Sequence, residues 1–137
     1  MIKIIFAVLF MLTCCSVSRA KDNGQWENTD PIVKKWYQNL MQPPPWTASS
    51  CCGEADAYWC DDYYARDKKS YCKITDDRDD KPLGRPHLDV GTEIEIPDSR
   101  LKFDQGNPTG HAIVFLGGAG SYIPGRPVFC YVQNSGS

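Results

Sequence analysis

The stretch AYWCDDYYARDKKSYCKIT, residues 57–75, gives the clearest indication of the fold class. Its two ends, residues 57–65 and 70–75, are rich in aromatic and β-branched side chains, which favour strands. Between them lies the polar segment Arg66-Asp67-Lys68-Lys69, which is typical of a turn. The pattern predicts a β-hairpin within a β-rich body.

The cysteines extend this prediction. If the hairpin turn is centred near Arg66, Cys60 lies opposite Cys72, so we expect these two residues to form a disulfide. Cys130 would then pair with Cys51 or with its neighbour Cys52, and one thiol would stay unpaired. Adjacent thiols can also act as a redox switch or bind a soft metal together with a histidine. Export favours the disulfide interpretation, because disulfides persist in oxidising compartments.

The first twenty residues are typical of a cleavable secretory signal peptide. Lys3 precedes an apolar run over residues 4–15, and the small residue Ala20 suits the cleavage site. This run is shorter than the roughly 20 apolar residues of a membrane-spanning helix, so we expect no stable membrane span after cleavage. Residues 21–137 are then one exported globular domain, either periplasmic or secreted.

The charge balance argues against two classes of partner. The chain has 15 basic and 17 acidic residues, which gives a formal net charge of −2. A nucleic-acid-binding domain usually carries a basic stripe, and none is visible here, so we expect no nucleic-acid partner. The same balance gives no electrostatic attraction to an anionic membrane surface.

Residues 30–42 are predicted to form one N-terminal amphipathic helix of the domain. Asp30 suits the N-cap, and Pro31 suits the first helical position. The three prolines that follow cannot continue a helix, so residues 43–46 are predicted to form an extended strap. Apolar side chains recur at spacings of three and four, as expected for a helix with one buried face: Ile32, Val33, Trp36, Tyr37, Leu40 and Met41.

Residues 57–132 are predicted to form the β-rich body. Residues 92–97 alternate between apolar and charged side chains, as in a half-exposed strand. Residues 111–116 and 128–132 are denser apolar runs, which favour buried strands. Counting the hairpin, we expect about five strands in a mainly β fold with a minor helical part. The predicted architecture is a small antiparallel barrel or curled sheet, stapled by disulfides.

Two polar features carry the candidate chemistry. The acidic run at residues 76–80 could suggest calcium, but its interleaved arginine breaks the alternation of a calcium loop, so we expect a solvated turn. We predict no metal site and no cofactor. Histidine is the usual acid–base residue near neutral pH, and the two histidines lie close to other hydrogen-bonding residues. The candidate pocket residues are His111, His87, Arg85, Asn107 and Thr109.

Several motifs carry a resemblance across most of the domain. They are SCCGEADAYW at 50–59, GRPHLDVGTEIEIPDSRL at 84–101, GNPTGHAIVFL at 106–116 and VFCYV at 128–132. With them the chain resembles a family of small exported bacterial proteins that carries no assigned activity. The resemblance implies one coherent fold in an extracytoplasmic setting, and it implies no catalytic residue.

The expected function is that of an extracytoplasmic binding or structural module. Export, long loops, exposed aromatic residues and the lack of known catalytic motifs favour recognition of a protein or a cell-envelope component. The alternative is a small hydrolase or thiol-based enzyme that uses His111 or His87 with a carboxylate or the unpaired cysteine. A second alternative is a metal-binding protein that uses Cys51, Cys52 and a histidine.

Overall fold

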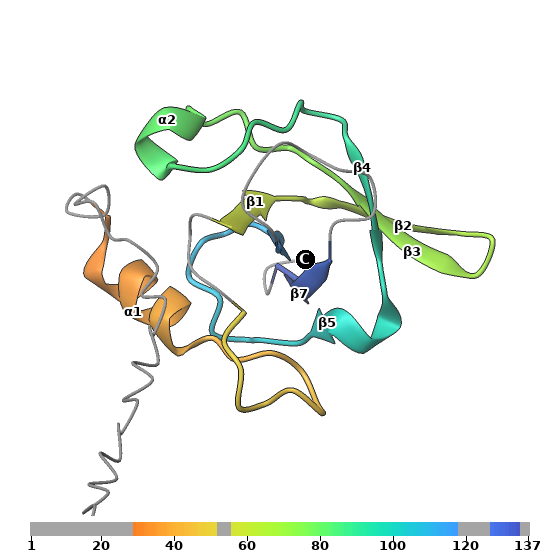
Figure 1. The fold of residues 1–137 in the computed structure, drawn as a ribbon, viewed down its shortest axis with the longest axis horizontal. Coiled ribbons are helices and arrows are strands. Elements are labelled where there is room, and N and C mark those ends of the chain that lie inside the picture. The colour runs from red at the N-terminus through yellow and green to blue at the C-terminus, as the bar shows by residue number, and fades with distance from the viewer. Residues whose placement is uncertain (1–28, 52–55, 118–126, 135–137) are drawn as a thin grey trace, which may run out of the picture.

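The computed structural model describes residues 29–51, 56–117 and 127–134 (Figure 1). The predicted signal peptide, residues 1–20, lies outside these ranges. Within them, no helix combines the length and apolar character that crossing a membrane requires.

The described chain is mostly strands with few helices, so the mainly β prediction is confirmed. The elements, in chain order, are α1 (Pro31–Asn39), β1 (Ala57–Trp59), β2 (Asp62–Arg66), β3 (Lys69–Lys73), α2 (Asp80–Leu83), β4 (Glu93–Ile96), the 3-10 helix η2 (Asp98–Arg100), β5 (Leu101–Lys102), β6 (Ile113–Leu116) and β7 (Val128–Val132).

The strands form two sheets, with the orders β1-β6-β7-β5 and β2-β3-β4. All neighbouring strands are antiparallel except β5 and β7, which are parallel. Among the described strands, no pairing closes either sheet on itself, so the barrel that we considered is not confirmed. Figure 1 shows α1 beside the four-stranded sheet and the β2–β3 hairpin projecting from the opposite side.

The predicted hairpin is present, but its first strand is interrupted. β1 pairs with β6, whereas β2 pairs with β3, so the expected strand over residues 57–65 divides at Cys60 and Asp61. A local pattern could not reveal this division, because it depends on pairing with a strand more than fifty residues away. The turn consists of Asp67 and Lys68, both with positive φ, as a two-residue hairpin turn requires.

The other expected strands are found with small changes. β4 buries Ile94 and Ile96 as the alternation predicted. β6 is buried on both of its faces, which explains its dense apolar sequence. Two elements were not predicted from the sequence, namely the short helix α2 and the short strand β5. The described strands number seven instead of about five, because the first predicted strand divides into β1 and β2 and because β5 is added.

Helix α1 begins as predicted but ends earlier. The Asp30 side chain accepts a hydrogen bond from the Ile32 N–H, which confirms the N-cap. The helix ends at Asn39 because the backbone of Leu40 becomes extended. The Leu40 carbonyl then accepts a hydrogen bond from the Cys51 N–H. Ile32 was expected on the buried face, but it is 69% exposed. The helix is internal to the chain, because residues 1–30 precede it.

The proline segment is folded, so the prediction of an extended strap over residues 43–46 is wrong. The Trp46 N–H donates to the Pro43 carbonyl, and the Ser49 N–H donates to the Trp46 carbonyl. An isolated bridge between Met41 and Ser50 closes the loop. The prolines end the helix as expected, but two successive turns then bring the chain back on itself.

The disulfides lie in two hydrophobic clusters on either side of the four-stranded sheet. Cys60 bonds to Cys72 in the cluster that contains Tyr58, and this confirms the predicted bridge. Cys51 bonds to Cys130 in the cluster that packs against α1, which settles one of the two alternatives for Cys130. The remaining candidate, Cys52, lies outside the described residues.

Candidate functional site

A buried arginine organises the polar residues between α2 and β1. The Arg85 side chain is 1% exposed. Its Nη1 donates to Asp76 Oδ2 and to the Ala57 carbonyl, both at 2.7 Å, and its Nε donates to Asp80 Oδ1 at 2.7 Å. Burial disfavours the charged guanidinium, but the hydrogen bonds to the two aspartates outweigh it and raise the pKa of Arg85. Arg85 is thus a fully neutralised internal cation.

Asp76 is the anion at the centre of this cluster. Its carboxylate is buried and accepts from Arg78 Nη2 at 2.7 Å, from Arg85 and from the Trp59 N–H at 3.0 Å. Burial opposes ionisation, but these hydrogen bonds hold the pKa of Asp76 well below its ordinary value. The prediction of a solvated turn is therefore wrong for Asp76. It holds only for exposed members of the run, such as Asp77 and Asp79.

His87 lies at the outer end of the same cluster. Its Nδ1 is 2.6 Å from Asp80 Oδ2, and its Nε2 is 2.9 Å from Asp89 Oδ1. The hydrogen bonds to Asp80 and then to Asp89 raise the pKa of His87. Because both ring nitrogens face carboxylates, the protonated ring would bridge two aspartates at the surface.

His111 lies in a second cluster, at the entrance to β6. Its Nδ1 is 2.9 Å from Asp61 Oδ2, and its ring stacks on Trp59 with the ring centroids 3.8 Å apart. Asp61 also accepts from the Thr75 hydroxyl at 2.8 Å and from the Ala112 N–H at 2.7 Å. Burial raises the pKa of Asp61, but the hydrogen bonds from His111, Thr75 and Ala112 lower it by more than burial raises it. The net pKa of Asp61 therefore lies below its ordinary value.

The other two predicted pocket residues shape the loop that precedes His111. Asn107 Nδ2 donates to the His111 carbonyl at 2.8 Å, while its Oδ1 accepts from the Thr109 hydroxyl at 2.6 Å. Asn107 is itself buried. These two side chains therefore hold the backbone of the loop in place instead of opening towards a ligand.

The five predicted residues thus form two groups. Arg85 and His87 share Asp80, whereas Asn107, Thr109 and His111 share one loop. The groups are joined indirectly, because Arg78 binds Asp76 and lies 4.1 Å from the centroid of the Trp59 ring on which His111 stacks.

Asp61, Trp59 and Asp76 were not predicted as site residues from the sequence. The spacing of residues in the sequence nevertheless indicated that Asp76 could be buried. Cys72, Ile74 and Asp76 are all buried, and their spacing of two places them on one side of the chain.

A groove between α1 and residues 104–108 is a concave site among the described residues that could receive a ligand. Its volume is about 370 Å³. Its apolar lining includes Ile32, Trp36, Leu40 and Pro108, and its polar lining includes Lys35 and Asp104. None of the five predicted pocket residues lines it.

A hydrogen bond fixes the shape of this groove. Trp36 Nε1 donates to Asp104 Oδ2 at 2.9 Å, and the two residues are 68 positions apart in the sequence. Asp104 also accepts from the Gly106 N–H at 2.8 Å, which shapes the opposite wall. A ligand therefore meets a wall whose aromatic side chain is already held in one orientation.

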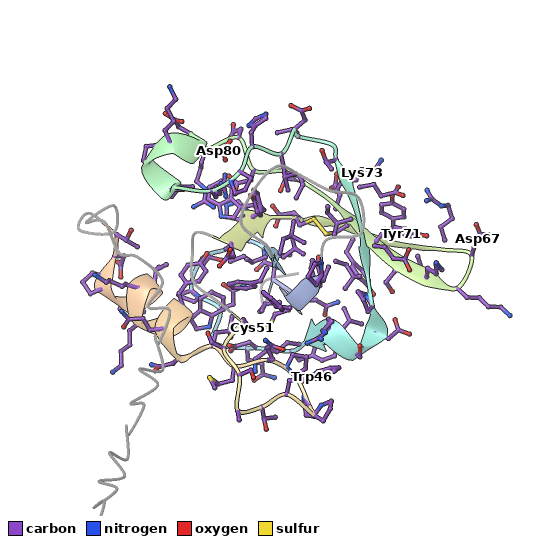
Figure 2. All side chains as sticks on the ribbon, viewed as in Figure 1. Trp46, Cys51, Asp67, Tyr71, Lys73 and Asp80 are labelled. Atoms are coloured by element: carbon purple, nitrogen blue, oxygen red, sulfur yellow. A yellow bond between two sulfur atoms is a disulfide. The ribbon has the colours of Figure 1, made fainter. Side chains whose placement is uncertain are left out.

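The outer face of the three-stranded sheet carries tyrosines and charges. Figure 2 shows Tyr71 and Lys73 on the side of this sheet that points away from the body of the molecule. Tyr64 stacks beside Tyr71 with the ring centroids 5.7 Å apart, and the Arg66 guanidinium lies 4.6 Å from the Tyr71 ring. Arg66 also forms two hydrogen bonds to Glu93, at 2.7 and 3.2 Å. Arg66 lies against the Tyr71 ring and is hydrogen-bonded to Glu93, so these charged and aromatic groups already have partners within the face.

In the described ranges, no group of three metal-ligating side chains is gathered. The sulfur of Cys51, which was part of the metal alternative, is bonded to Cys130 and is not a thiolate. Comparison with known protein families, with curated proteins and with solved structures finds no match.

Proposed function

We propose that this protein is an exported binding module, and that the groove between α1 and residues 104–108 receives an apolar segment of a cell-envelope protein. The observation that carries the proposal is the exposure of apolar surface in this concavity. Ile32 lies on the first turn of α1 and is 69% exposed, beside a groove with an indole wall. Concave, mostly apolar sites with a few polar groups are the usual form of binding sites.

The chemistry of the lining favours a polypeptide over a glycan. Ile32 and Pro108 offer exposed aliphatic surface, and the Trp36 N–H is already used by Asp104. A glycan requires many hydrogen-bond partners, whereas an apolar side chain requires only that water be displaced from such surface. Lys35 and Asp104 supply one charge of each sign at the rim, which suits backbone or polar groups of a partner chain.

The two disulfides support the extracytoplasmic part of the proposal. Both join cysteines that are fully buried. Disulfides of this kind persist in an oxidising compartment, and the predicted signal peptide would carry the chain there.

Photocrosslinking in the bacterium that makes the protein tests the proposal. Lys35, on the groove, is replaced by the photoreactive residue p-benzoylphenylalanine, and a matched variant carries it at Lys68, on the exposed hairpin turn. We expect one discrete protein adduct at position 35 and none at position 68. Ile32→Asp in the position-35 variant should abolish the adduct. Equal adduct patterns at the two positions, or none at either, would contradict the proposal.

A second candidate, a small hydrolase, is favoured by one observation. Asp61 holds Nδ1 of His111, and in hydrolytic sites a carboxylate in this position orients the ring so that Nε2 can activate water. Hydrolysis of p-nitrophenyl acetate by the wild type and by His111→Gln and Asp61→Asn decides the question. A rate above the buffer rate that both substitutions lower at least tenfold supports the enzyme, and identical rates in all three proteins exclude it.

A further inference from the structure

Strand β2 is an open edge of the three-stranded sheet. In the described part of the chain it pairs on one side only, with β3. Figure 1 shows this hairpin extending away from the body of the molecule. An edge strand presents backbone N–H and C=O groups that can pair with another strand, unless the sequence protects it.

The turn determines which backbone groups point outwards. Because the turn has two residues, the flanking Arg66 and Lys69 form a hydrogen-bonded pair. Hydrogen-bonded pairs then alternate along the ladder, so Tyr64 also faces β3 with its backbone groups. The backbone groups of Tyr63 and Ala65 therefore point away from the sheet.

Most of these outward groups have no partner among the described residues. The Tyr63 N–H donates to the Asp61 carbonyl at 3.0 Å, which is a contact within one short turn. The Tyr63 carbonyl and both backbone groups of Ala65 make no such contact. Asp62–Arg66 also contains no proline and no bulge, which are two of the common protections of an edge.

The charges on β2 make it complementary to a reversed copy of itself. Its sequence is Asp-Tyr-Tyr-Ala-Arg, with an acid at one end and a base at the other. We propose that β2 pairs antiparallel with β2 of a second copy of this chain, with a two-fold axis at Tyr64. This register places Asp62 opposite Arg66 of the second copy, and Tyr63 opposite its Ala65.

Other registers are less favourable. The outward groups of Tyr63 and Ala65 must face one another, so the axis must lie at Tyr63, Tyr64 or Ala65. Only an axis at Tyr64 uses the outward groups of both residues in both copies, which gives four backbone hydrogen bonds. In two of them the Tyr63 N–H exchanges its contact with the Asp61 carbonyl for one with the Ala65 carbonyl of the second copy. It is also the only register that places Asp62 opposite Arg66, in the pair type whose side chains approach most closely.

Arg66 has N–H donors left for an ion pair with Asp62 of the second copy. Its guanidinium makes two hydrogen bonds to Glu93, and an arginine has five N–H donors. The carboxylate of Asp62 is exposed. The two side chains lie on the same face of the sheet as Tyr64, because residues 62, 64 and 66 alternate with 63 and 65.

The interface is small, so the dimer should be weak. Five residues from each copy bury less than the roughly 800 Å² per partner of a standard interface. We expect a dimer that forms reversibly as the protein concentration approaches about 1 mM and dissociates on dilution.

Disulfide trapping tests the register. Tyr64→Cys places a thiol on the proposed axis, where the two Cα atoms would be about 4.5 Å apart, within the range of a disulfide. The matched control is Tyr71→Cys, on the same face but one strand inward, where the strand spacing puts the two copies about 14 Å apart.

Under mild oxidation at high protein concentration we expect at least ten times more covalent dimer from Tyr64→Cys than from Tyr71→Cys. The wild type measures the background from its own unpaired thiol. Equal yields from the two variants would overturn the proposal.

A charge swap tests complementarity by sedimentation. Asp62→Arg alone and Arg66→Asp alone place like charges opposite one another, so each should lose the wild-type dimer. An equal mixture of the two restores opposite charges in the heterodimer and should recover it. Recovery in the mixture also shows that both variants are folded. A wild type that stays monomeric at about 1 mM, or a mixture that stays monomeric, would refute the pairing.

Discussion

The buried cluster around Arg85 and the outer face of the β2-β3-β4 sheet use the same chemistry in different surroundings. The Arg85–Asp76 pair and the Arg66–Glu93 pair both have an N–O distance of 2.7 Å. The side chains of the first pair are 1% and 0% exposed, and those of the second are 52% and 34% exposed. Contact distance alone therefore does not rank the two pairs, and burial should decide what each contributes to stability.

The largest effect is expected in the buried cluster. Asp76→Asn keeps the shape of the side chain but removes the charge that neutralises Arg85. Removing one partner of a buried ion pair typically costs about 3–5 kcal/mol. Because Asp80 still pairs with Arg85, the free energy of unfolding should fall by about 3 kcal/mol, at the lower end of this range. Urea unfolding followed by tryptophan fluorescence at pH 7 measures this change. A loss below about 1 kcal/mol would mean that the buried pair behaves like a surface pair.

The disulfide between Cys60 and Cys72 connects the two regions, because it joins the end of β1 to β3. Its cysteines are 12 residues apart, so the chain-entropy estimate for its removal is about 3 kcal/mol. The double variant Cys60→Ala, Cys72→Ala should therefore lower the unfolding free energy by about this amount in the same urea titration. If the variant unfolded with the same midpoint as the wild type, the bridge would not restrain the unfolded chain as described.

The exposed pair provides the matched control for Asp76→Asn. Glu93→Gln makes the same change from carboxylate to amide, but at a surface where water replaces the lost partner. We expect a small decrease in the urea midpoint at low salt and no measurable decrease at about 1 M NaCl, because salt screens exposed charges. A loss as large as that of Asp76→Asn would remove the distinction between the two regions.

The smallest effect concerns His87, at the exposed rim of the buried cluster. Because the folded state raises the pKa of His87, its charged form stabilises the fold. This contribution is complete below the ordinary histidine pKa of about 6.5 and is lost as the pH rises through the higher folded value. The difference in melting temperature between the wild type and His87→Gln should be positive at pH 5 and close to zero at pH 9. A difference that does not change with pH would contradict this assignment.

Local patterns in the sequence predicted those parts of the fold that depend on near neighbours. The N-cap followed from Asp30, and the buried face of β4 followed from alternation. The Cys60–Cys72 bridge was also predicted, but the observed register places Tyr63, and not Cys60, opposite Cys72. The division of the first strand was not predictable in this way, because β1 pairs with a strand far along the chain.

The candidate site was harder to predict than the fold, for a physical reason. Acidic runs usually face water, but Asp76 meets two arginines and a backbone N–H that only the tertiary structure brings together. The groove forms between α1 and a loop nearly seventy residues away, and a single hydrogen bond from Trp36 to Asp104 joins them. No pattern within either segment indicates the other.

The predicted export across a membrane underlies the proposed function, and one measurement tests it most directly. Mass mapping of the intact protein, isolated from the cells that produce it with its thiols blocked on lysis, determines its first residue and its sulfur bonds together. We predict a chain that begins at Lys21, with Cys51 bonded to Cys130, Cys60 bonded to Cys72, and a blocked thiol at Cys52. An unprocessed chain inside the cell, with every cysteine reduced, would contradict the account.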